Sequence, residues 1–281
     1  MNKTRGIVVL AQNSATADYV LQASLLAMSL KITNPNEKIS VITDDVVPED
    51  YVPLFDNIIS IPYGDDAKNS EWKIENRWKI FHATPYDRTL VLDTDMLVLQ
   101  DISSWWNFLE NYELYFTSNV YTYRGDKATD DFYRKAFTAN KLPNLYSGLH
   151  YFEKTDFTLE FYTWLELVMK NWQLFYGTYV KEHYPGRPSV DVSAAIVSKI
   201  LDCNERITNK VNKFPSFTHM KPMVQDWTEP KDKWQDCVGA YITRDCEIKL
   251  GNHKQSGILH YTENDFVTTE LIERYRNKAH V

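Results

Sequence analysis

Short apolar runs and helical patterns alternate through the first hundred residues of the chain. Residues 6–13 (GIVVLAQN) form a continuous apolar run, which is typical of a strand buried on both faces of a sheet. Residues 16–32 place apolar side chains at helical spacing, and Asn34 with Pro35 ends that pattern. Further strands are predicted at 38–43, 57–62 and from Thr89 onward, with an amphipathic helix at 71–83. Such alternation with short connections predicts βαβ units and a mostly parallel sheet.

The second part of the chain keeps strands and helices but loses the regular alternation. Strands are predicted at 113–117, 148–152, 214–220, 240–250 and 257–261, and helices at 157–171, 191–202 and 266–278. Two polar stretches, 120–145 and 176–190, are either binding loops or plain surface. The sequence contains no repeat, low-complexity tract or Gly/Ser-rich linker. We therefore predict an α/β fold in a single domain, residues 1–281, with a mostly parallel central sheet and an elaborated C-terminal half.

Composition narrows the classes of partner. The 281 residues carry a formal net charge of −7, and the sequence has no Lys/Arg cluster long enough to follow a phosphate backbone. This argues against general nucleic-acid binding and anionic-membrane binding, while a local basic pocket for one diphosphate remains open. Aromatic residues make up 14% of the chain. Most of them are expected in the core, but aromatic faces also line sugar-binding surfaces.

Cysteine usage and hydropathy predict the cellular setting. Cys203, Cys237 and Cys246 are odd in number and show no Cys-x-x-Cys spacing, so we expect free thiols in a reducing compartment. The N-terminus lacks the apolar core of a secretory signal, and no apolar run reaches the roughly 18 residues of a transmembrane segment. These features predict a cytoplasmic protein.

The most informative motif is TLVLDTDMLVL, residues 89–99, in which Asp93 and Asp95 separate two apolar stretches. Unpaired carboxylates are costly inside an apolar segment, and residues i and i+2 of a strand point to the same side. Two hard oxygen ligands suit a divalent cation such as Mn²⁺ or Mg²⁺, and the carboxyl end of a strand is where open α/β sheets bind ligands. The alternative is that Asp93 caps a turn and Asp95 is solvated.

Four segments, in this order, resemble family 8 glycosyltransferases, a group that includes glycogenin and bacterial lipopolysaccharide galactosyl- and glucosyltransferases. They are the opening strand and helix (IVVLAQNSATADYVLQASLLAMSL), the second strand (ISVITDD), the Asp-x-Asp strand and the segment Tyr146-Ser147-Gly148. The resemblance is good over residues 6–153 and patchy over 154–265. It implies a GT-A fold, one Rossmann-like domain, with a nucleotide-binding half (1–118) and an acceptor-side half (119–281).

The resemblance implies a set of donor-binding residues in the first half. Ala11, Asn13 and Tyr19 fall where the family holds the uracil and ribose of its donor, although Tyr19 is equally explained as a core residue of the first helix. Arg77 falls where the family has a cation near the donor sugar and diphosphate; its alternative is a solvated helix face. Thr94, between the two aspartates, is placed in the same donor-binding set.

The resemblance also implies a metal site. Asp93 and Asp95 match the family's metal-binding pair, and a His late in the chain is the expected third ligand. His260 (SGILHY) fits that position better than His219 (FTHMKP), which also ends a predicted strand. In the family a Lys follows the late His and contacts a phosphate, but no Lys follows His260. Lys221 is the candidate replacement, unless donor affinity is weaker.

Residues near the reacting sugar lie in the second half. Asp191 (PSVDVSAA) falls where the family carries an acidic residue, which implies a catalytic role in orienting the sugar and stabilising developing positive charge. Its alternative is a helix N-cap. The family's Asn-Ser-Gly reads Tyr146-Ser147-Gly148 here, so the identity of the sugar stays open. Ser147 and Gly148 are placed with the donor-binding residues; Gly148 either lets the backbone approach the sugar or is an ordinary strand irregularity.

These features together predict a metal-dependent hexosyltransferase. It would move a sugar from a nucleotide-sugar donor, expected to be UDP-linked, to a hydroxyl of a saccharide, lipid-linked or protein acceptor, and the resemblance implies retention of anomeric configuration. One alternative is a nucleotidyltransferase, but residues 11–16 (AQNSAT) lack the Gly-rich phosphate loop and basic residue that it needs. The other is a non-catalytic transferase-like protein that binds a nucleotide sugar or a sugar, which the missing Lys after His260 favours.

Overall fold

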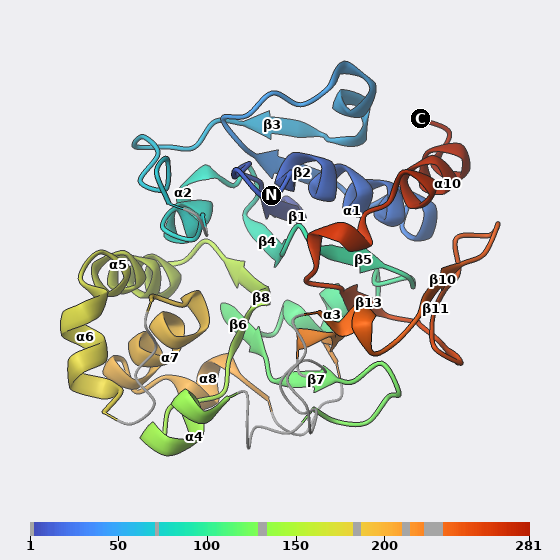
Figure 1. Ribbon diagram of the computed structural model, residues 1–281. Coiled ribbons are helices and arrows are strands. Elements are labelled where there is room, and N and C mark those ends of the chain that lie inside the picture. Colours follow the sequence, from blue (N-terminus) through green and yellow to red (C-terminus); the bar gives the residue numbers. More distant parts are fainter. Residues whose placement is uncertain (1–2, 71–72, 129–133, 182–186, 210–213, 222–232) are drawn as a thin grey trace.

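A computed structural model describes residues 3–70, 73–128, 134–181, 187–209, 214–221 and 233–281. Within these residues, a six-stranded sheet with the order β3-β2-β1-β4-β8-β6 forms the centre of the molecule (Figure 1). Its strands are β1 (Arg5–Leu10), β2 (Ile39–Ile42), β3 (Asn57–Ile59), β4 (Arg88–Leu92), β6 (Leu114–Thr117) and β8 (Tyr146–Glu153). The first four run parallel, and β8 is antiparallel to both of its neighbours. The α/β fold with a mostly parallel central sheet is thus confirmed.

Helices cover both faces of this sheet, as the apolar run of β1 predicts. Ile7 and Val9 pack into the core beside α1 (Tyr19–Thr33), whereas Val8 and Leu10 point to the opposite face. That face is covered mainly by α5 (Asp156–Lys170) and α7 (Val190–Ile200) (Figure 1). Since side chains alternate along a strand, a strand buried on both faces is apolar at every position.

Helix α1 is buried on nearly every side. Its residues from Gln22 to Leu30 are all buried, because α10 (Thr269–Ala279) and η1 (Glu49–Leu54) pack on it from outside the sheet. Figure 1 shows α10, in red, lying beside α1, in blue. The two ends of the described chain therefore stabilise the same layer.

The remaining strands form two smaller sheets. One has the order β5-β13-β9-β7 and consists of β5 (Met96–Val98), β7 (Asn119–Tyr121), β9 (Ser216–His219) and β13 (Ile258–His260). The other consists of β10 (Ala240–Ile242), β11 (Ile248–Leu250) and β12 (His253–Lys254). Because β4 belongs to the central sheet and β5 to the second, the chain passes from one sheet to the other through residues 93–95.

Further helices connect these strands. They are α2 (Ile80–Ala83), α3 (Trp105–Leu109), α4 (Lys135–Asn140), α6 (Trp172–Tyr179), α8 (Asn204–Ile207), η2 (Arg77–Lys79), η3 (Trp234–Asp236) and η4 (Asn264–Phe266). The polar stretches 120–145 and 176–190 contain parts of β7, α4 and α6, and their residues 129–133 and 182–186 lie outside the described part of the chain. The three cysteines are free, as expected. No described helix has both the length and the apolarity to cross a bilayer.

The helix predicted over residues 71–83 is wrong over residues 73–76, and its residues 71–72 lie outside the described part of the chain. Residues 73–76 are not helical, and the helical turns begin only with η2. The buried side chain of Asn76 gives the reason, since its amide donates to Gln12 Oε1 (2.7 Å) and Asp65 Oδ1 (2.6 Å), and its oxygen accepts from the backbone of Asp66 (3.1 Å). These side-chain hydrogen bonds hold a loop against the end of β1 and compete with helix formation.

The single strand predicted over residues 240–250 is also wrong. The chain reverses between β10 and β11, which pair antiparallel as a hairpin. The turn is closed by hydrogen bonds between Thr243 and Glu247, and Cys246 in it has a positive φ of 58°. The apolar positions on either side of this turn belong to two short strands.

Candidate active site

The two aspartates of the TLVLDTDMLVL motif lie where β4 ends and β5 begins. Asp93 follows β4, and its backbone N–H donates to Gly148 O on β8 (2.9 Å). Asp95 precedes β5, which pairs antiparallel with β13 in a register that sets Met96 against His260. The pairing of two strands about 160 residues apart in sequence thus fixes the distance between Asp95 and His260.

Asp93, Asp95 and His260 form one compact group. One ligand atom from each residue lies within 4.8 Å of the other two, and His260 Nε2 is 2.9 Å from Asp95 Oδ2. Burial opposes ionisation of Asp95, but the imidazole of His260 outweighs it and lowers the pKa of this carboxyl. Burial likewise lowers the pKa of His260, but the Asp95 carboxylate outweighs it, and the net shift is upward.

This donor set fits a divalent cation. Two carboxylates and an imidazole supply the oxygen and nitrogen donors that Mn²⁺ and Mg²⁺ accept. The other ring nitrogen of His260, Nδ1, is buried and has no hydrogen-bond partner among the described residues. A bound cation would take the place of the positive charge that a protonated His260 brings to Asp95.

His219, the competing candidate for the third ligand, lies next to His260 on the neighbouring strand. It ends β9, pairs in register with His260 on β13, and the two rings stack with centroids 4.6 Å apart. Burial and the positive charge of a protonated His260 hold the pKa of His219 well below its ordinary value. Among the described residues, the group of three around the aspartates contains His260 and not His219.

Gly148 is explained by Asp93. A Cβ atom at this position would lie 2.7 Å from Asp93 Oδ2 and 3.3 Å from the Asp93 Cγ atom. A glycine is therefore needed for β8 to run past the carboxylate that follows β4. The position is a close approach of backbone to a site residue and not an ordinary strand irregularity.

Arg77 points at the same carboxylate. It begins the short turn η2 and forms an ion pair with Asp93, with only 19% of its side chain exposed. It does not lie on a solvated helix face. The guanidinium thus stands at the carboxyl end of β4, beside the group that could hold a cation.

Asp191 is held by two elements from elsewhere in the chain. It is the second residue of α7, whose N-cap is Ser189, so Asp191 is not the cap. Its carboxylate accepts hydrogen bonds from the backbone N–H and the hydroxyl of Ser147 at the start of β8, and from Arg134 Nη1 (2.6 Å). Burial raises the pKa of Asp191, but Arg134 and Ser147 outweigh it and the net shift is downward.

Arg134 is a residue of this site that the sequence did not reveal. Its guanidinium carbon lies 3.7 Å from the ring centroid of Phe137 and 4.1 Å from that of Tyr146, and its Nε donates to Asn144 Oδ1 (2.6 Å). The ring of Tyr146 therefore packs against the guanidinium of Arg134. No local motif marks this arginine, because its hydrogen-bond partners lie 10 to 57 residues away.

The residues predicted to hold the nucleotide lie at the same edge of the sheet. Ala11 is fully buried just after β1, and its N–H donates to Ile42 O (3.0 Å). Asn13 joins the loop to α1, because its side-chain oxygen accepts from the N–H of Val20 (3.0 Å). Tyr19, the first residue of α1, is partly buried and packs against the core.

Thr94 and Lys221 complete the set. The buried Thr94 hydroxyl donates to Gln22 Oε1 (3.4 Å), and Gln22 in turn donates to Asn264 Oδ1 (2.8 Å), so α1 and η4 support the Asp-x-Asp turn. Lys221 follows β9, and burial lowers its pKa; the carboxylates of Asp191 and Asp95 oppose this shift without reversing it. Its ammonium group therefore interacts electrostatically with both Asp95 and Asp191.

Comparisons with known proteins place the fold. No protein-family model matches the chain, and no curated protein matches its sequence. Among solved structures, the galactosyltransferase LgtC, in complex with donor and acceptor sugar analogues, is similar over 98% of this chain and 95% of its own, with a TM-score of 0.53 and 14% identity. The bifunctional glycosyltransferase WbbM in its apo form is similar over 99% of this chain and 50% of its own, with a TM-score of 0.52 and 12% identity. The chain therefore has the GT-A fold that these glycosyltransferases share.

Proposed function

We propose that the protein is a metal-dependent glycosyltransferase that uses a nucleotide-sugar donor, UDP-linked, and a hydroxyl acceptor. The observation that carries the proposal is the convergence of Asp93, Asp95 and His260 at the carboxyl end of β4, in a GT-A fold. A saccharide, a lipid-linked sugar or a protein side chain would supply the acceptor hydroxyl. The similarity to LgtC and WbbM supports glycosyl transfer as the class of reaction.

The metal would be held by Asp93, Asp95 and His260. A bound Mn²⁺ or Mg²⁺ supplies positive charge that stabilises the diphosphate leaving group as the bond to the sugar breaks. Arg77, paired with Asp93, and Lys221, close to Asp95 and Asp191, add cationic side chains at the same edge. These two residues would position the diphosphate.

Asp191 would orient the sugar and stabilise positive charge on its anomeric carbon. Its carboxylate carries hydrogen bonds from Ser147 and Arg134, and its lowered pKa makes it a weak proton acceptor at neutral pH. The reaction breaks the bond between the anomeric carbon and a phosphate oxygen and forms one to the acceptor oxygen. We propose that the acceptor hydroxyl attacks from the face that the diphosphate leaves, so its proton passes to the departing diphosphate and retention of anomeric configuration needs no dedicated base.

The test is UDP release from a panel of UDP-sugars, measured with and without Mn²⁺. We expect turnover that requires the metal, that is lost in Asp95→Asn and His260→Ala, and that survives in His219→Asn. Thermal-shift measurements of the same variants with UDP separate binding from turnover, since a ligand that binds only the native state raises its melting temperature. Binding without turnover in the wild-type protein would instead identify a non-catalytic nucleotide-sugar-binding protein.

A further inference from the structure

A cavity lies away from the candidate active site. It has a volume of about 430 Å³ and is bounded by the β10–β11 hairpin, η4 and the first turn of α10. Asp93, Asp95, Asp191 and His260 do not line it. Cavities of this size accommodate small organic ligands. In Figure 1 the hairpin projects beside the C-terminal part of the chain.

The apolar part of this cavity combines a closed floor with an exposed aromatic ring. Ile248, Phe266 and Leu271 are buried and form the floor. Tyr241, on β10, lines the cavity with 64% of its surface exposed. A large aromatic face at the mouth of an apolar pocket is suited to stacking on the C–H face of a flat, partly apolar ligand.

The polar part offers hydrogen-bond acceptors. Gln235 donates through Nε2 to Asp265 Oδ1 (2.7 Å), which fixes the orientation of the amide. Its oxygen, Oε1, is buried and has no hydrogen-bond partner within the described part of the chain. Gln235, Asp265 and Glu270 line the cavity, so its polar side offers oxygen acceptors to a ligand that brings O–H or N–H donors.

The charges around the cavity are already compensated. Asp265 forms an ion pair with Lys233, and Glu270 forms one with Arg274. The two carboxylates disfavour an anionic ligand, and their pairing leaves little negative charge to attract a cation. A neutral ligand with hydroxyl donors and an apolar face meets both conditions.

From these features we infer that the cavity binds a neutral saccharide unit, at a site separate from the candidate active site. This inference goes beyond the proposed function and does not depend on it. The two sites share one turn, because Asp265 and Phe266 of η4 line the cavity while Asn264 of the same turn bonds Gln22, the partner of Thr94. A sugar bound here contacts the turn that supports the Asp-x-Asp loop.

The experiment is saturation-transfer-difference NMR with neutral oligosaccharides as probes. Maltotriose, cellotriose, lactose and chitotriose are titrated into the full chain in the absence of nucleotide. We expect millimolar binding of at least one probe, weakened at least about tenfold in Tyr241→Ala, which corresponds to about 1.4 kcal/mol. Asp95→Asn should bind the probe like the wild type. Leu174→Ala, a change of an apolar side chain that is 70% exposed on α6, is the matched control and should also bind normally.

A second variant guards against a folding defect. Gln235→Met removes the unpaired oxygen together with the exposed hydrogen bond to Asp265, two losses of opposite sign, so the melting temperature should change little while probe binding should weaken. Absence of binding by all four probes to the wild type overturns the inference. So does binding that survives Tyr241→Ala or is lost in Asp95→Asn. Displacement of the probe signal by spermidine at equal concentration would identify a cation site and also overturn it.

Discussion

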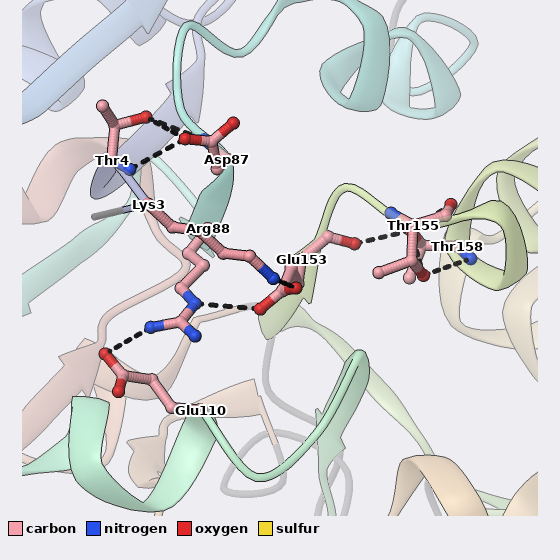
Figure 2. Close-up of polar contacts among 8 residues, drawn as sticks. All are labelled: Lys3, Thr4, Asp87, Arg88, Glu110, Glu153, Thr155 and Thr158. Atoms are coloured by element: carbon pink, nitrogen blue, oxygen red, sulfur yellow. Dashed lines mark hydrogen bonds and ion pairs between the residues drawn. The ribbon is translucent and has the colours of Figure 1, made fainter. Parts of the chain in front are cut away.

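Strands β4 and β8 carry polar clusters at both of their ends, and the two clusters use their charges differently. At one end, Arg88 of β4 and Glu153 of β8 face each other in register. Figure 2 shows Glu153 accepting hydrogen bonds from both Lys3 and Arg88, while Arg88 also forms an ion pair with Glu110 (2.9 Å). Each carboxylate there meets a cation from a neighbouring element.

At the other end of the same strands, acceptors converge. Arg77 pairs with Asp93 here too, but Asp93 and Asp95 also lie within 4.8 Å of the His260 ligand atom, and the buried Nδ1 of His260 has no partner among the described residues. A cluster that compensates its own charges stabilises the fold. A cluster that gathers carboxylates and an imidazole around one point is arranged for a cation from outside. The comparison teaches that convergence of ligands, and not the number of charges, distinguishes a binding site from a structural network.

The largest expected effect comes from neutralising one carboxylate at each end. Asp93→Asn should lower metal-dependent UDP release at least about 1,000-fold, because charge stabilisation of the leaving group is lost. Glu153→Gln, the matched carboxylate-to-amide change at the opposite end, should leave turnover unchanged. Steady-state kinetics at saturating Mn²⁺ makes the measurement. Equal loss in both variants would mean that the two clusters do not differ in function.

The next effect concerns the ion pair beside the site. Arg134→Met leaves the Asp191 carboxylate without its cation, and we expect the free energy of unfolding to fall by about 3 kcal/mol, measured by urea denaturation. In the double variant with Asp191→Asn the two losses should not add, because both changes act on one interaction. Additive losses would show that Arg134 stabilises the protein only through the rings of Phe137 and Tyr146.

The Asp-x-Asp turn was predictable because its signal is local. An apolar run followed by two alternating carboxylates indicates both a buried strand and the residue at which it ends. Strands β4 and β5 follow that pattern. His260 required the family pattern, since its place beside Asp95 arises from a strand pairing across the whole second half of the chain.

Arg134 and the loop before η2 could not be predicted, because side chains distant in sequence determine them. Arg134 bonds Asp191, 57 residues away, and nothing in its own neighbourhood marks it as buried. Asn76 bonds Gln12, 64 residues away, and overrides an amphipathic pattern that would otherwise form a helix. Local periodicity predicts elements, whereas these contacts exist only once the sheet has formed.

A smaller effect should appear in acid at the Arg88–Glu153 end. Burial raises the pKa of Glu153, but hydrogen bonds from Lys3 and Arg88 outweigh it and the net shift is downward. A lowered pKa in the folded protein gives stability above the unfolded value of 4.5 that is lost as the pH falls through the folded value. Glu153→Gln should therefore cost about 2 kcal/mol at neutral pH and progressively less below pH 4.5. Urea denaturation across this range makes the measurement, and a cost independent of pH would contradict it.

The smallest effect is expected from Lys3, at the exposed side of the same cluster. Its side chain is 50% exposed, so solvent screens its ion pair with Glu153, and Lys3→Met should cost less than about 1 kcal/mol and even less in about 0.5 M NaCl. Lys79→Met is the matched comparison near the candidate active site, because that side chain is only 1% exposed while its amine pairs with Asp66 at 2.9 Å. Its loss leaves Gly64 O and Asp66 without their donor and should cost more than the Lys3 change at either salt concentration. Equal losses of stability in the two variants would contradict this expectation, because they would show that burial of the lysine does not determine how much its ion pair contributes.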